Sequence, residues 1–347
     1  MVDFKITENE AGQRLDRFLR KYMKRAPLSM IYKTIRKDVK VNGKRAHEDT
    51  ILQEGDQLSL YIPEEKLNDL TRQQTHRRVK RQFRIAYEDE NLLIVEKPSG
   101  LLTHGDSREK KNTLANQVCG YLQEKGEFDP SKEKSFVPSP VNRLDRNTSG
   151  LLLCGKSLLG TQKLTGLIRN RQIHKYYRLF LLGEVTEKQI LNGYLLKDTK
   201  KNQVKILTKP AEGADEIKTG IEPLACLELP GIGTVTYAQA ELFTGKTHQI
   251  RAHFAWAGHP LLGDPKYGNE AVNRTLKQTY GIGRQLLHAW QIRQKDAASG
   301  ILPTGGITCP LPEDFQKLRQ EYSPKPQDKK PGGNRRLYAA VSQAFIL

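Results

Sequence analysis

The sequence predicts an α+β protein in which two folded domains are joined by a basic segment. Its 347 residues exceed the roughly 100–200 of a single domain. Helical and strand-like apolar patterns follow one another without regular alternation, which argues against a doubly wound parallel sheet. A stretch poor in apolar residues separates two patterned regions. We therefore predict domains at 1–63 and 83–322, a linker at 64–82, and a basic, mobile tail at 323–347.

The first domain should begin with two amphipathic helices. The spacing i, i+3, i+4, i+7, i+8 places the following residues on one face of the first helix: Leu15, Phe18, Leu19, Tyr22 and Met23. A second helix should follow Pro27, with Ser29 as its N-cap and with Ile31 and Ile35 on its buried side. Basic residues lie mostly off these apolar faces, where solvent or a polyanion could reach them.

Short strands complete this domain. Val39 and Val41 alternate as in a strand, and Asn42-Gly43 is a strong two-residue hairpin signal. A turn at Gly55-Asp56 precedes a second alternating strand over 58–62. The expected product is a small domain that presents two basic helices beside a few strands.

The second domain opens with alternating residues over 83–87 and a continuous apolar strand over 92–95. The tetrapeptide Lys97-Pro98-Ser99-Gly100 then turns the chain. A helix is expected over 112–122. Strands and helices mix thereafter, and we find no internal repeat.

Charge indicates the class of partner. The formal net charge is +18, and neutralisation of phosphates by basic groups drives binding to nucleic acid. A basic tail that serves only solubility is the alternative. The linker is either a flexible tether or an arm that orders on RNA. It contains Arg72, His76, Arg77, Arg78, Lys80 and Arg81.

Several classes of protein are not expected. The four cysteines are scattered without a CxxC pair, so neither a zinc site nor a disulfide framework is predicted. His248 and His253 are five residues apart, which does not suit two metal ligands on one helical face. No apolar run approaches the ~18 residues of a membrane span, and the first residues do not begin a signal peptide. We expect a cytoplasmic monomer without metal, cofactor or membrane contact.

Two segments match the sequence pattern of phosphate-binding loops without the local structure that such loops need. Residues 150–157 fit the pattern GxxxxGK[ST], and residues 240–247 fit a looser form. A phosphate cradle needs a compact loop of inward N–H groups. Leu151-Leu152-Leu153-Cys154 is instead suited to a buried strand. A nucleotide hydrolase is thus an alternative that these residues disfavour.

Three segments carry the candidate chemistry. In the first, Asp145 stands between two arginines on a polar loop ahead of an apolar strand, and this positive field keeps a carboxylate ionised. The second, Lys175-Tyr176-Tyr177, enters another apolar strand, so its two tyrosines must face opposite ways. The third runs from Thr244 to His253 and continues through Gly263-Asp264-Pro265. It is dense in turn formers and polar groups, which suits a site.

Together these segments resemble the RluA-type family of RNA pseudouridine synthases. The R-L-D-x-x-T-S-G loop, the K-x-Y strand and the T-G-K-T-H-Q-I-R block follow the family's order, and K-P-x-G resembles its early turn. The resemblance extends from about Gly12 to about Leu318. The V-x-V-N-G signal, the following Gly55-Asp56 and the basic helices are similar to the α-L RNA-binding module.

The resemblance implies an α-L domain followed by a mixed, largely antiparallel catalytic domain. Asp145 would be the catalytic aspartate, Tyr177 would contact the target base, and Arg251 would pair with Asp145. Arg143 would hold the site open beside a flipped base. The residues expected to bind RNA are Arg143, Arg146, Lys175, Lys246, His248, Arg14, Arg17, Lys33 and Arg36. Asn142 departs from the family, which usually has His there.

The reaction that the resemblance implies suits these groups. Uracil must leave its glycosidic nitrogen, turn and rejoin the ribose through carbon 5, which requires a base flipped out of the helix. Asp145 could act as the nucleophile or remove the ribose 2′ proton, and Tyr177 is a candidate base or relay for the carbon-5 proton. Large-subunit ribosomal RNA is the expected substrate, with transfer RNA as the alternative. A non-catalytic RNA-binding protein of the same fold is the runner-up, and intact Asp145, Tyr177 and Arg251 argue against it.

Overall fold

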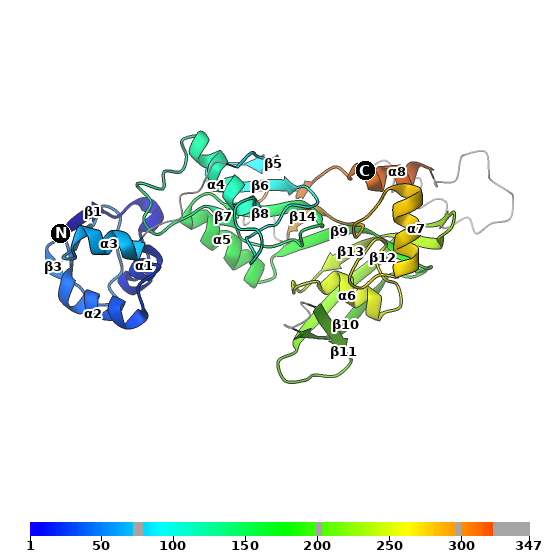
Figure 1. Ribbon diagram of the computed structural model, residues 1–347, viewed down its shortest axis with the longest axis horizontal. Coiled ribbons are helices and arrows are strands. Elements are labelled where there is room, and N and C mark those ends of the chain that lie inside the picture. Colours follow the sequence, from blue (N-terminus) through cyan, green and yellow to red (C-terminus); the bar gives the residue numbers. More distant parts are fainter. Residues whose placement is uncertain (72–78, 199–202, 296–299, 322–347) are drawn as a thin grey trace.

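The computed structural model describes residues 1–71, 79–198, 203–295 and 300–321. Figure 1 shows an elongated molecule, with the amino-terminal lobe at one end and a larger body built on one long sheet. The expected tail and the linker residues 72–78 lie outside the described residues. No helix within the described ranges has the length and apolarity needed to cross a bilayer.

The amino-terminal lobe is a four-stranded antiparallel sheet packed against helices. Its sheet order is β1-β4-β2-β3. The elements are β1 (Val2–Lys5), the 3₁₀ helix η1 (Glu8–Glu10), α1 (Leu15–Tyr22), α2 (Leu28–Asp38), β2 (Val39–Val41), β3 (Lys44–Arg45), β4 (Gln57–Leu60) and α3 (Glu64–Thr71). The predicted face of α1 is buried in this lobe's core together with Ile31 and Ile35 of α2. Asn42-Gly43 makes the predicted hairpin, and both residues have positive φ.

Two expectations for this lobe were wrong. Ser29 does not cap α2, because the helix begins at Leu28, ahead of Ser29, and Pro27 is the N-cap. The φ of proline already suits the start of a helix. The first part of the expected linker is also ordered. Residues 64–71 form α3, and Leu67 joins the amino-terminal core. Two leucines, Leu67 and Leu70, in a polar stretch gave too weak a period to reveal this helix.

The larger domain contains a long, mostly antiparallel sheet. Its order is β11-β10-β12-β13-β9-β14-β8-β6-β5, with β15 beside β14 and β7 beside β8. The pairing of β14 with β8 is parallel and the others are antiparallel. The strands are β5 (Arg84–Glu88), β6 (Leu92–Lys97), β7 (Ser139–Pro140), β8 (Ser149–Gly155), β9 (Ile173–Leu182), β10 (Gln189–Asp198), β11 (Gln203–Leu207), β12 (Asp215–Leu229), β13 (Gly233–Leu242), β14 (Leu287–Gln294) and β15 (Ile307–Thr308).

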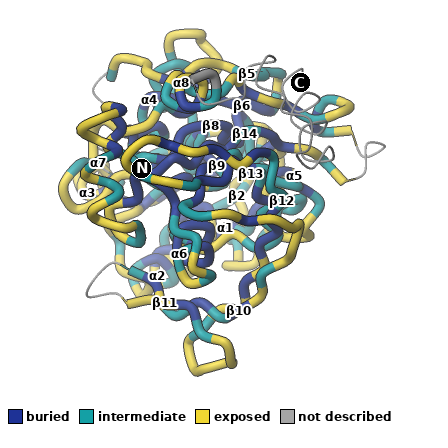
Figure 2. Tube along the Cα trace, turned by 90° about the vertical axis from the view of Figure 1, so that its right-hand side faces the viewer, coloured by how far each residue is buried: buried dark blue, intermediate teal, exposed yellow. Residues whose placement is uncertain are grey.

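The apolar runs are continuous because both faces of the central strands are covered. Leu152 and Cys154 of β8 face one core, and Leu151 and Leu153 face another. The described helices are α4 (Leu114–Glu124), α5 (Leu158–Arg169), α6 (Gln249–Trp256), α7 (Glu270–Tyr280) and α8 (Glu313–Glu321). Helices α4 and α6 contribute to the first core, and α5 contributes to the second. Figure 2 shows the central strands as a buried layer between more exposed loops.

Candidate active site

Asp145 lies on the loop between β7 and β8, just before the chain enters the buried sheet. The turn from this loop into β8 requires Gly150. Its φ is +113°, and a Cβ at this position would lie 2.2 Å from the carbonyl oxygen of Ala289 on the parallel neighbour β14. A side chain would therefore push β8 away from β14. This close approach determines where the loop leaves the sheet and where Asp145 projects.

A buried lysine supports the loop from one side. Lys97 is 1% exposed, and its ammonium group donates hydrogen bonds to the carbonyl oxygens of Pro98, Leu101 and Arg146, at 2.7–2.9 Å. Burial lowers the pKa of Lys97 to about 7, while the charge of Asp145 acts in the opposite direction. The predicted turn after β6 is thus tied directly to the residue that follows Asp145.

Replacement of Lys97 by Met should destabilise the protein by about 3 kcal/mol, because three carbonyl groups lose their donor and each buried unsatisfied group costs about 1–3 kcal/mol before relaxation. Urea unfolding measures the change. The matched control is Lys188→Met, since Lys188 forms an exposed ion pair with Glu222 and should cost less than about 1 kcal/mol. Equal stabilities of the two variants would contradict the supporting role of Lys97.

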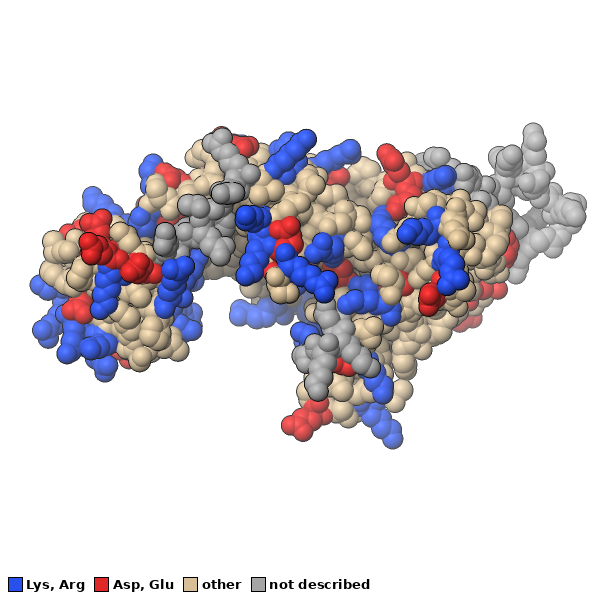
Figure 3. All heavy atoms as spheres, in the orientation of Figure 1, with Lys and Arg blue, Asp and Glu red and all other residues tan. Residues whose placement is uncertain are grey.

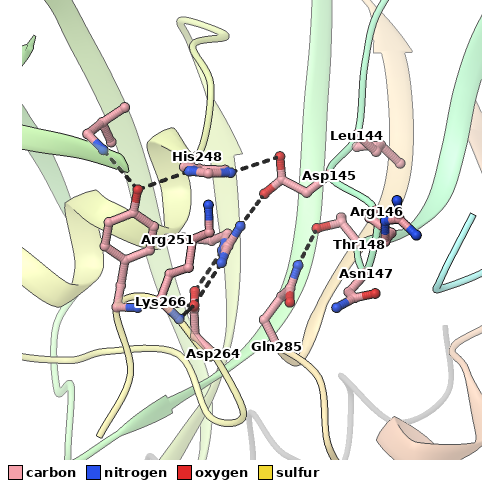
Figure 4. A network of polar contacts seen from close by, with 12 residues as sticks. Leu144, Asp145, Arg146, Asn147, Thr148, His248, Arg251, Asp264, Lys266 and Gln285 are labelled. Carbon is pink, nitrogen blue, oxygen red and sulfur yellow. Dashed lines mark hydrogen bonds and ion pairs between the residues drawn. The ribbon is translucent and has the colours of Figure 1, made fainter. Parts of the chain in front are cut away.

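The segment that leads into β14 supports the loop from the other side. Arg284 donates to the carbonyl oxygen of Asn147, and Gln285 donates to the Thr148 hydroxyl at 3.3 Å. Figure 4 shows Gln285 reaching this hydroxyl beside the carboxylate of Asp145. The Ser149 hydroxyl bonds Nδ1 of His288 at 2.9 Å. Three consecutive loop residues are therefore held by side chains distant in the sequence.

One arginine joins two carboxylates at the centre of the site. Arg251, on α6, donates from NH1 to Asp145 Oδ2 at 2.8 Å, as the sequence predicts. Its Nε and NH2 bond both oxygens of Asp264, at 2.7 and 2.8 Å. This fork holds the guanidinium in one plane, and Figure 4 shows it aimed at Asp145. Asp264 is therefore the residue that orients Arg251.

Asp264 is adapted to stay ionised although its side chain is fully covered. Burial acts to raise its pKa. The hydrogen bonds and charge of Arg251, together with the N–H groups of Lys266 and Tyr267, outweigh burial and lower it. The Asp145 side chain is 25% exposed. Arg251 thus connects a buried carboxylate to one that solvent or a substrate can reach.

His248 approaches the second oxygen of Asp145. Its Nε2 lies 3.9 Å from Asp145 Oδ1, and its Nδ1 lies 2.9 Å from the hydroxyl of Tyr267. Because that hydroxyl accepts from the N–H of Val204 in β11, it can donate to Nδ1, which assigns the proton to Nε2, facing Asp145. Burial lowers the pKa of His248, despite an opposing effect of Asp145. The residue has a φ of +55°, a strained conformation typical of functional positions.

Tyr177 faces the same core as Leu152 and Ile250, whereas Tyr176 faces the other way. Burial raises the pKa of Tyr177 above its ordinary value, and the negative charge of Asp145 adds to this effect. The phenol therefore stays protonated at neutral pH. A protonated hydroxyl suits the relay that the sequence suggested better than it suits a phenolate base.

The remaining predicted RNA-binding residues divide by position. Arg143 and Arg146 are exposed on the Asp145 loop, and Arg146 contacts Asp106 at 3.4 Å. Lys175 shares a face of β9 with Tyr177 and lies close to Gly245. Lys246 pairs through its ammonium group with Asp215, and its contact with RNA stays a prediction.

The four basic residues predicted on the amino-terminal helices are not brought to this site. Arg17, Lys33 and Arg36 are exposed on the separate lobe. Arg14 pairs with Asp16 through its Nε at 3.0 Å. Any contact of these residues with RNA must therefore occur away from Asp145.

Asn142, at the position where the family usually has His, makes a structural hydrogen bond. Its side-chain oxygen accepts from the N–H of Leu153 at 3.0 Å. This bond holds the strand that follows the Asp145 loop, a task that needs an acceptor and no titratable group. The departure at this position thus leaves the geometry of Asp145 intact.

The sequence did not reveal the contacts of four residues in this arrangement: Lys97, Asp264, Tyr267 and Gln285. Asp264 and Tyr267 stand in turn-rich peptides whose density of polar groups was noticed, but no partner could be assigned to them. Lys97 was recognised only as part of the K-P-x-G turn, and neither its burial nor the contact of Gln285 has a local sign in the sequence. Only their distance to the Asp145 network identifies them.

The comparisons with known proteins agree with this geometry. Residues 91–256 match the family model described as RNA pseudouridylate synthase. The chain is 33% identical over 322 residues to a protein of Vibrio vulnificus (strain CMCP6) named ribosomal large subunit pseudouridine synthase C, covering 91% of this chain and 94% of that protein. It is 30% identical to the protein of the same name from Escherichia coli (strain K12), covering 91% and 95%.

The chain belongs to the family of RNA pseudouridine synthases and is therefore an isomerase that acts on RNA. Solved structures share its fold. Human RNA pseudouridylate synthase domain containing 4 has a TM-score of 0.52 at 19% identity and covers 69% of this chain and 94% of its own. Human RNA pseudouridylate synthase domain containing 1 has a TM-score of 0.52 at 20% identity, with coverage of 75% and 95%. The α+β prediction, with its largely antiparallel sheet, is confirmed.

Proposed function

We propose that this enzyme converts specific uridines of large-subunit ribosomal RNA to pseudouridine in the cytoplasm, as a monomer, with Asp145 as its catalytic carboxylate. The observation that carries the assignment is the partly exposed Asp145, held by a buried Arg251–Asp264 pair. The names of the relatives support ribosomal RNA as the substrate. The net charge of +18 suits a polyanion of this kind.

The two oxygens of Asp145 have different roles in this proposal. Oδ2 is occupied by Arg251 at 2.8 Å, whereas Oδ1 has the more distant His248 at 3.9 Å. Oδ1 therefore acts on the substrate, either by attack on the ribose carbon that releases uracil or by removal of the ribose 2′ proton. In the first route the bond between Asp145 and the ribose carbon breaks again when carbon 5 bonds to that carbon, and in the second the 2′ proton returns to the ribose. In both routes the bond from N1 to the ribose breaks, N1 takes up a proton, a bond from carbon 5 forms, and the carbon-5 proton leaves. We assign the relay of that proton to the hydroxyl of Tyr177, whose pKa is raised by burial and by the nearby charge of Asp145.

Replacement of Tyr177 by Phe should lower turnover by roughly 10²-fold or more, the range typical of acid–base groups, while RNA affinity changes little. The ring remains to pack on the base, and only the hydroxyl is removed. Single-turnover kinetics at saturating enzyme measure the step. The matched control is Tyr176→Phe on the opposite face of the strand, which should react at the wild-type rate. An unchanged rate for Tyr177→Phe would reduce this residue to packing.

The amino-terminal lobe and the basic linker over 72–81 should supply affinity and choice of site, because both are basic while Asp145 and its partners lie in the other domain. A chain beginning at Gln82 keeps the contact of that residue with Gln117 on α4. It should fold and retain activity on uridine-containing RNA, with lower affinity. Its slope of log K against log salt should fall by about 0.7–0.9 for each phosphate that the shortened chain no longer neutralises. An unchanged affinity and salt slope would exclude RNA binding by the lobe.

The substrate is tested by mapping pseudouridine in RNA from cells that lack this protein and from complemented cells. Loss of pseudouridine from large-subunit ribosomal RNA, restored by the wild-type gene and not by a gene encoding Asp145→Asn, is the expected result. Loss confined to transfer RNA would overturn the substrate and keep the activity.

A further inference from the structure

The amino-terminal lobe contacts the catalytic domain through a fully buried carboxylate. Glu10 ends η1 and is 0% exposed. Its Oε1 accepts from the backbone N–H groups of Lys134 and Ser135, at 2.6 and 2.9 Å, and its other oxygen accepts from Thr7 N–H within the lobe. A buried carboxylate requires such donors, because it is cut off from water on every side. Two adjacent amides on one oxygen also impose a direction.

A second contact prevents rotation about the first. The side-chain amide of Asn9 donates to Glu133 at 3.2 Å, and its oxygen accepts from Leu158 N–H at 3.0 Å. Leu158 is the first residue of α5, so the lobe supplies a partner to a free N–H of that helix. The lobe therefore meets the catalytic domain at two separate segments, residues 133–135 and the start of α5.

Both ends of this junction lead to functional elements. Gln13 donates to Ser135 Oγ at 2.9 Å and accepts from Lys21 of α1 at 3.1 Å, which connects the junction to a basic helix. On the other side, α5 packs through Leu164 against β8, the strand that follows Asp145. Figure 3 shows Lys and Arg side chains on the lobe and a hollow between the lobe and the part that carries β10 and β11.

The core of the lobe is drawn from residues 2–70 and is separate from the cores of the catalytic domain. The hydrogen bonds between them are directional, because a donor must point at its acceptor. They suit a junction that sets orientation.

We propose that Glu10, with Asn9 and Gln13, forms a polar latch that holds the basic helices at a set position relative to Asp145 and thereby determines which uridine reaches the site. The proposal rests on the RNA-binding role proposed above for the lobe. Rigid attachment of two binding surfaces favours substrates whose two contacts have the matching spacing. Glu10 is then a positioning residue for site choice and takes no part in the chemistry.

The test uses the full chain with Glu10→Ala, with Glu133→Ala as a variant on the catalytic side that leaves the lobe's own residues intact. The control is Glu8→Ala, since Glu8 is exposed on the same η1. Amide hydrogen exchange at Lys134 and Ser135 should rise at least about 10-fold in Glu10→Ala and stay at the wild-type rate in Glu8→Ala. Unchanged exchange in Glu10→Ala would overturn the latch, whatever the substrate.

Activity provides the second readout. On large-subunit ribosomal RNA, both latch variants should lower the ratio of modification at the preferred uridine to that at other uridines by about 10-fold, the effect expected when a fixed spacing becomes variable. On a short single-stranded oligonucleotide they should match wild type within about 2-fold. Faster amide exchange in Glu10→Ala, together with an unchanged ratio of modification between the preferred uridine and other uridines, would refute the role of Glu10 in site choice. A wild-type chain that left ribosomal RNA unmodified would refute the proposed substrate and the claim of site choice, while exchange would still decide the latch.

Discussion

Replacement of Asp145 by Asn should abolish isomerisation, with a loss of at least about 10⁴-fold in turnover, in the range seen when a nucleophile or its partner is removed. The change is nearly isosteric, and the amide oxygen can still accept the hydrogen bond from Arg251. The substitution removes the negative charge that the reaction needs. RNA affinity should stay within about 3-fold, because phosphate contacts supply most of the binding.

Tritium release from RNA labelled at carbon 5 of uridine measures the reaction. Asp106→Asn is the matched control, because Asp106 also contacts an arginine of this loop yet is exposed. It should retain near wild-type turnover. Activity of Asp145→Asn comparable with that of the control would remove Asp145 from the mechanism.

Replacement of Asp264 by Asn should lower both stability and turnover. The buried guanidinium of Arg251 would lose its charged partner, and breaking one side of a buried pair costs about 3–5 kcal/mol. Arg251 would also lose the fork that holds its plane. Turnover should therefore fall by roughly 10²-fold, as for a group misplaced by about 1 Å.

Urea unfolding and single-turnover kinetics on the same preparation separate the two effects. The control is Asp215→Asn, because the pair of Asp215 with Lys246 is exposed; it should cost less than about 1 kcal/mol. A stable Asp264→Asn variant with wild-type turnover would show that Asp145 needs no orienting partner behind Arg251. A destabilised variant with full turnover at low temperature would confine Asp264 to folding.

The stability of the fold should also depend on the protonation of Asp264. Arg251 and the backbone amides lower the pKa of Asp264 in the fold, so its contribution to stability is present above the pKa of an unfolded Asp and is lost as pH falls through the folded value. This behaviour explains why Asn, which cannot ionise, is the informative replacement.

Local features of the sequence determined much of this protein. The alternation of Tyr176 and Tyr177, the Asn42-Gly43 hairpin and the buried strand at 151–154 follow from backbone periods and turn preferences that act within a few residues. The order of the motifs was sufficient to identify the family and to nominate Asp145, Tyr177 and Arg251.

Only the tertiary structure decided how these pieces are held together. The parallel pairing of β14 with β8 joins His288 to Ser149. Long-range contacts are also made by the carboxylate of Asp264 to Arg251, by the ammonium group of Lys97 and by the carboxylate of Glu10. Such contacts depend on how the strands pair and how the loops pack, and a polar residue in a loop carries no local sign of its partner. The ion pair of Lys246 with Asp215 is of the same kind, because nothing near Lys246 in the sequence marks which carboxylate it will face.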